Sequence, residues 1–99
     1  MSAQPDLQRL TQDYRIAFLR YLPRREEAAL DRGYALGRQA LVSGTALLDL
    51  VHIHHHVLAE TLDPADAEQH QERVTAAGAF FAEVVAAYEM AQRGLLDRD

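Results

Sequence analysis

The stretch LLDLVHIHHHVLAETLDP, residues 47–64, decides the fold. Its apolar residues recur every three or four positions, which is the period of one helical face. We expect the buried side to consist of Leu47, Leu48, Val51, His55, Leu58 and Leu62. Leu50, Ile53 and Val57 then widen the apolar surface. Asp63–Pro64 predicts a cap followed by a new helix start, because the first helical residue does not need its amide hydrogen.

The same periodicity extends outward and predicts three further helices, at residues 6–22, 24–43 and 64–93. We expect Pro23 to stop the first helix by steric clash and a missing donor. Gly44 and Gly94 are expected to terminate the second and the fourth. Short turns favour antiparallel neighbours. The sequence therefore predicts an all-α, four-helix up-down bundle.

Two features predict how the helices pack. Gly33 and Gly37 share one face of the second helix, and each costs about 1 kcal/mol relative to alanine, so we expect another helix to approach closely there. In the fourth helix, Phe80 lies beside a continuous stripe. That stripe consists of Val74, Ala77, Phe81, Val84, Tyr88 and Ala91.

The third and fourth helices are apolar on more than one side, which exceeds what one thin core can bury. This surplus predicts that the chain forms a dimer through its helices. We assign six residues to the core or the dimer seam: Val51, Leu58, Phe80, Phe81, Val84 and Tyr88.

The composition of the chain argues against several classes of function. The 99 residues make one domain, and a net charge of −5 argues against nucleic acid. There is no cysteine, so we expect neither disulfides nor a thiolate site. We see no signal peptide and no apolar run near the roughly 20 residues of a membrane span. The default expectation is a cytoplasmic protein that binds neither membrane nor nucleic acid.

Four residues of the third helix suggest a metal site. Asp49, His52, His56 and Glu60 follow one another at steps of three, four and four, so they share one stripe. Di-iron bundles need matched ligands from several helices, and no second such pair exists. We therefore favour a histidine-rich exposed face with His55 partly buried, and we expect no cofactor. A metal-binding or small-molecule-sensing bundle remains the alternative.

Catalysis in this chain is not expected. Ser43 lies in a turn between helices, without the strand-to-helix elbow that exposes a reactive serine. The glycines occupy helix or cap positions rather than a phosphate-binding loop. The sequence therefore favours a binding module over an enzyme.

The segments Leu48–Leu58 and Tyr88–Gly94 (YEMAQRG) resemble the N-terminal domain of the phosphatase RsbU and its relatives. The resemblance extends from about Tyr14 to Gly94. It implies a bacterial helical domain that dimerises and binds an activator similar to the switch kinase RsbT. It further implies that the signal passes to a PP2C-type serine phosphatase or a histidine-kinase-like domain. The output of such partner switching is control of an alternative sigma factor in a stress response.

The resemblance also implies roles for particular residues. The partner-binding face is expected at Glu27, Asp31, Ala82 and Ala86. The signal output is expected at Glu89, Met90, Arg93 and Gly94. We expect residues 1–94 to form the regulatory and dimerisation domain, and residues 95–99 to begin a linker to an effector domain that is missing here.

Overall fold

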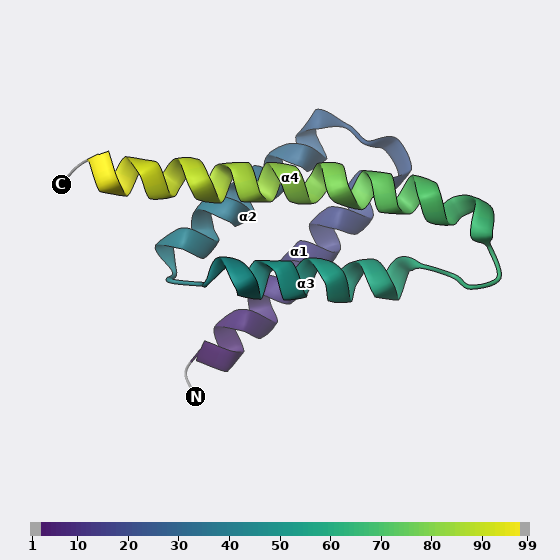
Figure 1. Cartoon of the computed structure of the whole chain (residues 1–99), viewed down its shortest axis with the longest axis horizontal. Coiled ribbons are helices and arrows are strands. Elements are labelled where there is room, and N and C mark those ends of the chain that lie inside the picture. Colours follow the sequence, from purple (N-terminus) through teal and green to yellow (C-terminus); the bar gives the residue numbers. More distant parts are fainter. Residues whose placement is uncertain (1–2, 98–99) are drawn as a thin grey trace.

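The computed structural model describes residues 3–97, and the side chains of residues 7–95. Within this part the chain forms four helices and no strand, which confirms the all-α prediction. The helices are α1 (Ala3–Arg24), α2 (Glu27–Val42), α3 (Leu47–Thr61) and α4 (Ala67–Asp97). Figure 1 shows α3 and α4 as one antiparallel hairpin that crosses α1 and α2 obliquely.

The four-helix bundle is flat, because α2 and α4 lie close together whereas α2 and α3 lie apart. α2 and α4 pack most extensively, whereas no Cα atom of α2 lies within 8 Å of one in α3 within the described residues. The principal extents are 50 × 31 × 18 Å. Since a helix with its side chains is about 10 Å across, the shortest dimension holds only two layers of helices. Consequently much of each helix faces outward.

Close approach of α2 to α4 explains the flattening. A Cβ atom on Gly37 would overlap the carbonyl oxygen of Val84 and lie 3.0 Å from the Cβ of Ala87. At Gly33 the nearest atom would be Cε1 of the Phe80 ring, at 3.1 Å. The two glycines therefore let α2 reach the α4 backbone, as the sequence predicted.

Aromatic rings fill the centre of the core. The Phe80 ring has no exposed surface and its centroid lies 5.2 Å from that of Tyr14, at an interplanar angle of 89°. Phe18 and Tyr21 lie 5.7 and 5.6 Å from the same ring. Edge-to-face pairs at this distance stabilise beyond the area they bury. Val84, fully buried, and Tyr88 also belong to the core, as expected.

The α4 stripe is displaced from the predicted one. Phe80 is fully buried and Phe81 only partly, whereas Val74 is exposed. We expected Phe80 beside the stripe, which was wrong. Either of the two adjacent phenylalanines fits the helical period of the sequence. Phe80 is the buried one because three aromatic rings of α1 pack around it.

The buried side of α3 also differs from the prediction. Leu50, Ile53 and Val57 are buried, at steps of three and four. The predicted stripe faces outward instead: Leu47, Leu48 and Val51 are 42%, 63% and 40% exposed. The sequence pattern fits either stripe, because α3 is apolar around more than half of its circumference. Packing against α1 and α4 alone decides between them.

Three helix boundaries in the first half of the chain differ from the predicted ones. α1 continues through Pro23 to Arg24, since a proline this close to the end removes only one bond of the last turn. It stops where Arg25 adopts a φ of 54° and donates its amide to the Tyr21 carbonyl at 2.7 Å. α2 then begins at Glu27 and ends at Val42, with Ser43 as its C-cap and Gly44, whose φ is 79°, directly after the cap.

α4 begins and ends later than expected. Asp63 accepts the Ala65 amide within the preceding turn, while Asp66 accepts the Gln69 amide at 3.3 Å, as an N-cap does. The helix then continues through Gly94 to Asp97, so Gly94 is not its terminator. Glycine permits termination, but it ends a helix only where its own φ turns positive.

α4 is also long and apolar enough to match a membrane span by length and composition, because an 18-residue window within Ala67–Leu95 has a mean hydropathy of 1.3. The sequence analysis expected no uninterrupted apolar run near this length, and Glu83 and Glu89 interrupt this helix. The same helix supplies Phe80 and Val84 to the core. A core helix of a soluble bundle passes the same test, so the match is weak evidence for a membrane.

Candidate functional site

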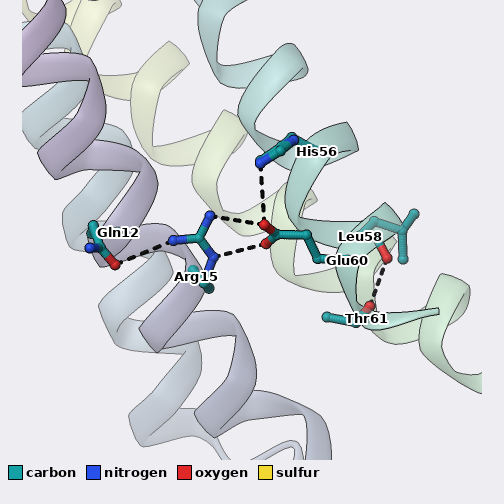
Figure 2. A network of polar contacts seen from close by, with 6 residues as sticks. All are labelled: Gln12, Arg15, His56, Leu58, Glu60 and Thr61. Atoms are coloured by element: carbon teal, nitrogen blue, oxygen red, sulfur yellow. Dashed lines mark hydrogen bonds and ion pairs between the residues drawn. The ribbon is translucent and has the colours of Figure 1, made fainter. Parts of the chain in front are cut away.

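The histidine stripe of α3 is tied to α1 at one end, through Glu60, while His52 and His56 are exposed. Glu60 accepts two hydrogen bonds from the Arg15 guanidinium of α1, with Nε to Oε1 at 2.8 Å and the second amine to Oε2 at 3.2 Å. His56 Nε2 lies 3.3 Å from Oε2 of the same carboxylate. Figure 2 shows Glu60 held between Arg15 and His56, with Gln12 on the far side of Arg15.

This ion pair fixes the state of the carboxyl group. The hydrogen bond from Arg15 lowers the pKa of Glu60 below its ordinary value, and the charge of Arg15 and the neighbouring His56 act in the same direction. Glu60 is therefore ionised and already engaged at neutral pH. In effect it clamps α3 to α1, which is a structural task.

The metal site proposed as an alternative gains no support from this geometry. His52 lies one turn before His56 on α3, and Asp49 lies two turns before it. No group of three or more potential ligands converges anywhere in the described part of the chain. The carboxylate that would complete the site, on Glu60, faces Arg15 instead.

His54 is the histidine that matters for packing, and the sequence reasoning missed it. Its ring stacks on Phe81 with centroids 4.3 Å apart and an interplanar angle of 13°. Nδ1 lies 3.2 Å from the Tyr14 hydroxyl. Burial, and secondarily the charge of His55, lower the pKa of His54. His55, expected to be partly buried, is exposed. Once the structure identifies Leu50, Ile53 and Val57 as the buried face, position 54 follows as inward, but the sequence alone fits two faces.

The outward-facing residues of α3 form a second apolar stripe, which we call the α3 outer stripe. It consists of Leu47, Leu48 and Val51 and continues to the exposed His55, while the partly buried Leu58 also packs against the core and Leu62 follows the end of the helix. Leu48, Val51, His55 and Leu58 follow one another at steps of three or four residues and therefore share one face. Phe81 of α4 borders this face through its contact with His54. The stripe offers a continuous apolar surface on one edge of the molecule.

The residues expected to bind a partner flank one seam. All four are exposed: Glu27 and Asp31 on α2, Ala82 and Ala86 on α4. Tyr34, one turn after Asp31, donates its hydroxyl to the sulfur of Met90 at 4.0 Å. Met90 lies one turn after Ala86 on the same face. The two pairs therefore border the same α2–α4 seam, on the side that Tyr34 and Met90 bridge.

Farther along, this seam opens into a groove of about 350 Å³. Val42 and Leu95 line it, and both expose apolar surface. Arg38 is the charged residue among its walls. The groove is open rather than enclosed, so it offers a surface for docking more than a cavity for a small molecule.

The expected output residues lie on the last described turns of α4. They are Glu89, Met90, Arg93 and Gly94, all exposed. Glu89 and Arg93 form an ion pair of 2.7 Å at a spacing of four residues. Such exposed pairs contribute little to stability. The Glu89–Arg93 pair nevertheless supports the helical conformation of the last turns of α4, which extend past the end of α2.

Comparison with known proteins agrees with the resemblance seen in the sequence. A family model described as the phosphoserine phosphatase RsbU, N-terminal domain, matches residues 12–91. The matched region takes in α2, α3 and most of α4, together with the α3 outer stripe and the α2–α4 seam. Searches against curated proteins and against solved structures gave no match.

Proposed function

The chain belongs to the RsbU N-terminal domain family, whose members are soluble regulatory modules of stress-signalling phosphatases, and on that basis we propose that it is a dimeric receptor for a switch kinase. In this proposal an RsbT-like kinase binds the α2–α4 seam. The signal then passes along α4 to an attached phosphatase or kinase-like domain. The catalytic PP2C domain is not present in these 99 residues. We place the protein in the bacterial cytoplasm.

Exposed area supports the dimer. The chain exposes 6772 Å². A folded monomer of 11.1 kDa is expected to expose about 5,700 Å² from the general scaling of area with mass. The excess is roughly 1,100 Å², which includes the surface of the chain ends, and an interface of standard size buries roughly 800 Å² on each partner. A second copy covering the α3 outer stripe would remove surface of this order.

The charge of the stripe supports the same interface. Its members are apolar apart from His55, and none is an arginine or a carboxylate. In a two-fold interface each residue meets the same patch on the other copy, so like charges would repel. A stripe with no acidic or arginine side chain avoids that repulsion. The α3 outer stripe is therefore the surface of this chain best suited to self-association.

The partner site is proposed on the seam that Tyr34 and Met90 bridge. Ala82 and Ala86 present little side chain, so another backbone can approach α4 closely. Glu27 and Asp31 supply two carboxylates at the edge, which suit a basic patch on the kinase. Beyond the seam, α4 continues through Gly94 into the proposed linker at residues 95–99.

The dimer is tested by the solution mass of the chain, measured by light scattering across a dilution series. We expect a dimer for the chain itself and a monomer for Leu48→Asp, because the variant buries a carboxylate in the seam. The matched control is Leu19→Asp on α1, where the side chain is 47% exposed and lies off the stripe. Circular dichroism verifies that both variants fold. A monomeric parent chain, or a Leu48→Asp variant that stays dimeric, contradicts the proposed dimer interface at the α3 outer stripe.

The partner site is tested by titrating the RsbT-like kinase of the same bacterium into the labelled chain and following fluorescence anisotropy. Ala86→Arg is expected to weaken binding at least tenfold, through bulk and a charge unlike that of Glu27. Gln92→Arg makes a similar change on another exposed face of α4 and serves as the control. Equal affinity of the two variants would place the kinase elsewhere.

A further inference from the structure

Charge is unevenly divided along the chain. Seven of the ten arginines fall in residues 1–38, whereas ten of the fifteen acidic residues fall in residues 39–99. The α1–α2 hairpin is therefore basic, although the whole chain has a net charge of −5. A basic surface on an acidic protein is a local feature that needs its own explanation.

Three of these arginines are exposed, line hollows between α1 and α2, and make no ion pair within the described residues. Arg15 pairs with Glu60 and Arg24 with Glu26, but Arg9, Arg20 and Arg32 make no ion pair there. An unpaired arginine keeps its five donors available for a carboxylate.

A groove runs between these arginines. Ile16 and Arg20 of α1 and Arg32 and Ala35 of α2 border a hollow of about 420 Å³. Its other walls include Ala17 and Leu36, which are nearly buried and apolar. The groove thus combines an apolar lining with basic edges.

The groove continues toward Arg9. Asp13 and Gln39 line both the first hollow and a second one of about 220 Å³, so the two adjoin. From Arg9 to Arg20 the groove follows α1 for about 16 Å, at 1.5 Å per residue. That length accommodates three turns of another helix.

We propose that this α1–α2 groove binds an acidic amphipathic helix of a different protein. The apolar side of that helix would pack against Ile16 and the groove floor. Carboxylates on its flanks would reach Arg9 at one end and Arg20 and Arg32 at the other. This site is separate from the α3 outer stripe and the α2–α4 seam, and it does not depend on the function proposed for them.

A second copy of the chain is a poor occupant. Two such grooves facing each other across a two-fold axis would bring arginines together, with Asp13 as the one acidic residue among the lining. The acidic α3–α4 half of another copy could bind only head to tail, which does not close into a dimer. Charge complementarity therefore selects a different chain with an acidic helix.

The test uses the 99-residue chain and two synthetic 14-residue helices. One has a leucine face flanked by glutamates, and the other has glutamines in place of the glutamates. We expect amide shifts on titration, followed by NMR, to cluster around Ile16 and Ala35. We expect the glutamate helix to bind at least tenfold more tightly than the glutamine helix, with affinity falling as salt rises.

The combined variant Arg20→Glu and Arg32→Glu is expected to weaken the glutamate helix at least tenfold. Arg38→Glu is the matched control, because Arg38 lines the α2–α4 groove instead. Equal binding of both helices, or shifts centred on the α3 outer stripe, would overturn the proposal. So would equal shifts from a single-stranded oligonucleotide, since the groove would then select any polyanion.

Discussion

Replacing Gly37 by alanine tests whether the contact between α2 and α4 shapes this bundle. In isolation the change favours the helix by about 1 kcal/mol, because alanine has the better propensity. In the folded chain the added Cβ would overlap the Val84 carbonyl oxygen, which belongs to the α4 backbone. A helix backbone cannot rotate away as a side chain can, so α2 and α4 must separate.

The size of the effect follows from these opposing terms. Overpacking a core typically costs 1–3 kcal/mol, and we take about 3 kcal/mol because the obstacle is backbone. After the gain in propensity, the free energy of unfolding should fall by about 2 kcal/mol. For a domain of this size that corresponds to a melting temperature lower by roughly 8–16 °C.

Urea denaturation followed by far-UV circular dichroism measures this change, at one protein concentration so that association does not alter the midpoint. Gly78→Ala is the matched control, because a Cβ there would meet nothing within 4 Å and Gly78 also lies in a helix. We expect that variant to gain up to about 1 kcal/mol. Gly33→Ala should fall between the two, since its obstacle is the Phe80 ring. A Gly37→Ala variant as stable as Gly78→Ala would refute the reasoning.

Three other substitutions test the core and the two polar contacts. Phe80→Ala should lower the free energy of unfolding by about 3–5 kcal/mol, because it empties the centre of the aromatic cluster, and a thermal melt measures it. The parent chain should lose stability as the pH falls below 6.5, the ordinary pKa of a histidine, and His54→Gln should make that loss smaller. The folded state holds the His54 pKa low, so acid favours the unfolded chain, and urea midpoints at pH 7.5 and 5.5 measure the difference. Glu60→Gln should destabilise at neutral pH but lose its effect as the pH falls below 4.5 and through the lowered pKa of Glu60, because the parent carboxylate then becomes protonated too. Urea midpoints at pH 7 and pH 3 check that convergence.

The number and type of the elements could be predicted from local pattern. Apolar residues at helical spacing determine each helix, and Gly33 and Gly37 predicted the close approach that the structure shows at Val84. These features depend on residues near one another in the sequence. Boundaries were predicted less well, because Pro23 and Gly94 permit an end that the surrounding residues do not impose.

The choice of buried face could not be predicted. Around α3 the stripe through Leu50 and Val57 and the stripe through Leu48 and Val51 are both apolar, so the period is satisfied twice. Only contacts from distant parts of the chain separate them. The same holds for Glu60, whose partner Arg15 lies 45 residues away. Periodicity within one helix contains no information about such a pairing.

The backbones of α2 and α3 lie apart, which restricts how the partner site and the dimer interface can be coupled. A partner on the α2–α4 seam touches α2 and α4, whereas the proposed dimer seam belongs to α3. Since no Cα atoms of α2 and α3 lie within 8 Å of each other in the described residues, coupling through packed helices runs by way of α1 or α4, beside the short connection at residues 43–46. Only α4 borders both proposed surfaces, through Met90 and Phe81, and it also leads out of the bundle. Coupling free energies are reciprocal, so a kinase that binds the dimer more tightly than the monomer must strengthen the dimer by the same factor. A displacement of α4 is therefore the simplest single event that would join partner binding, dimer stability and output.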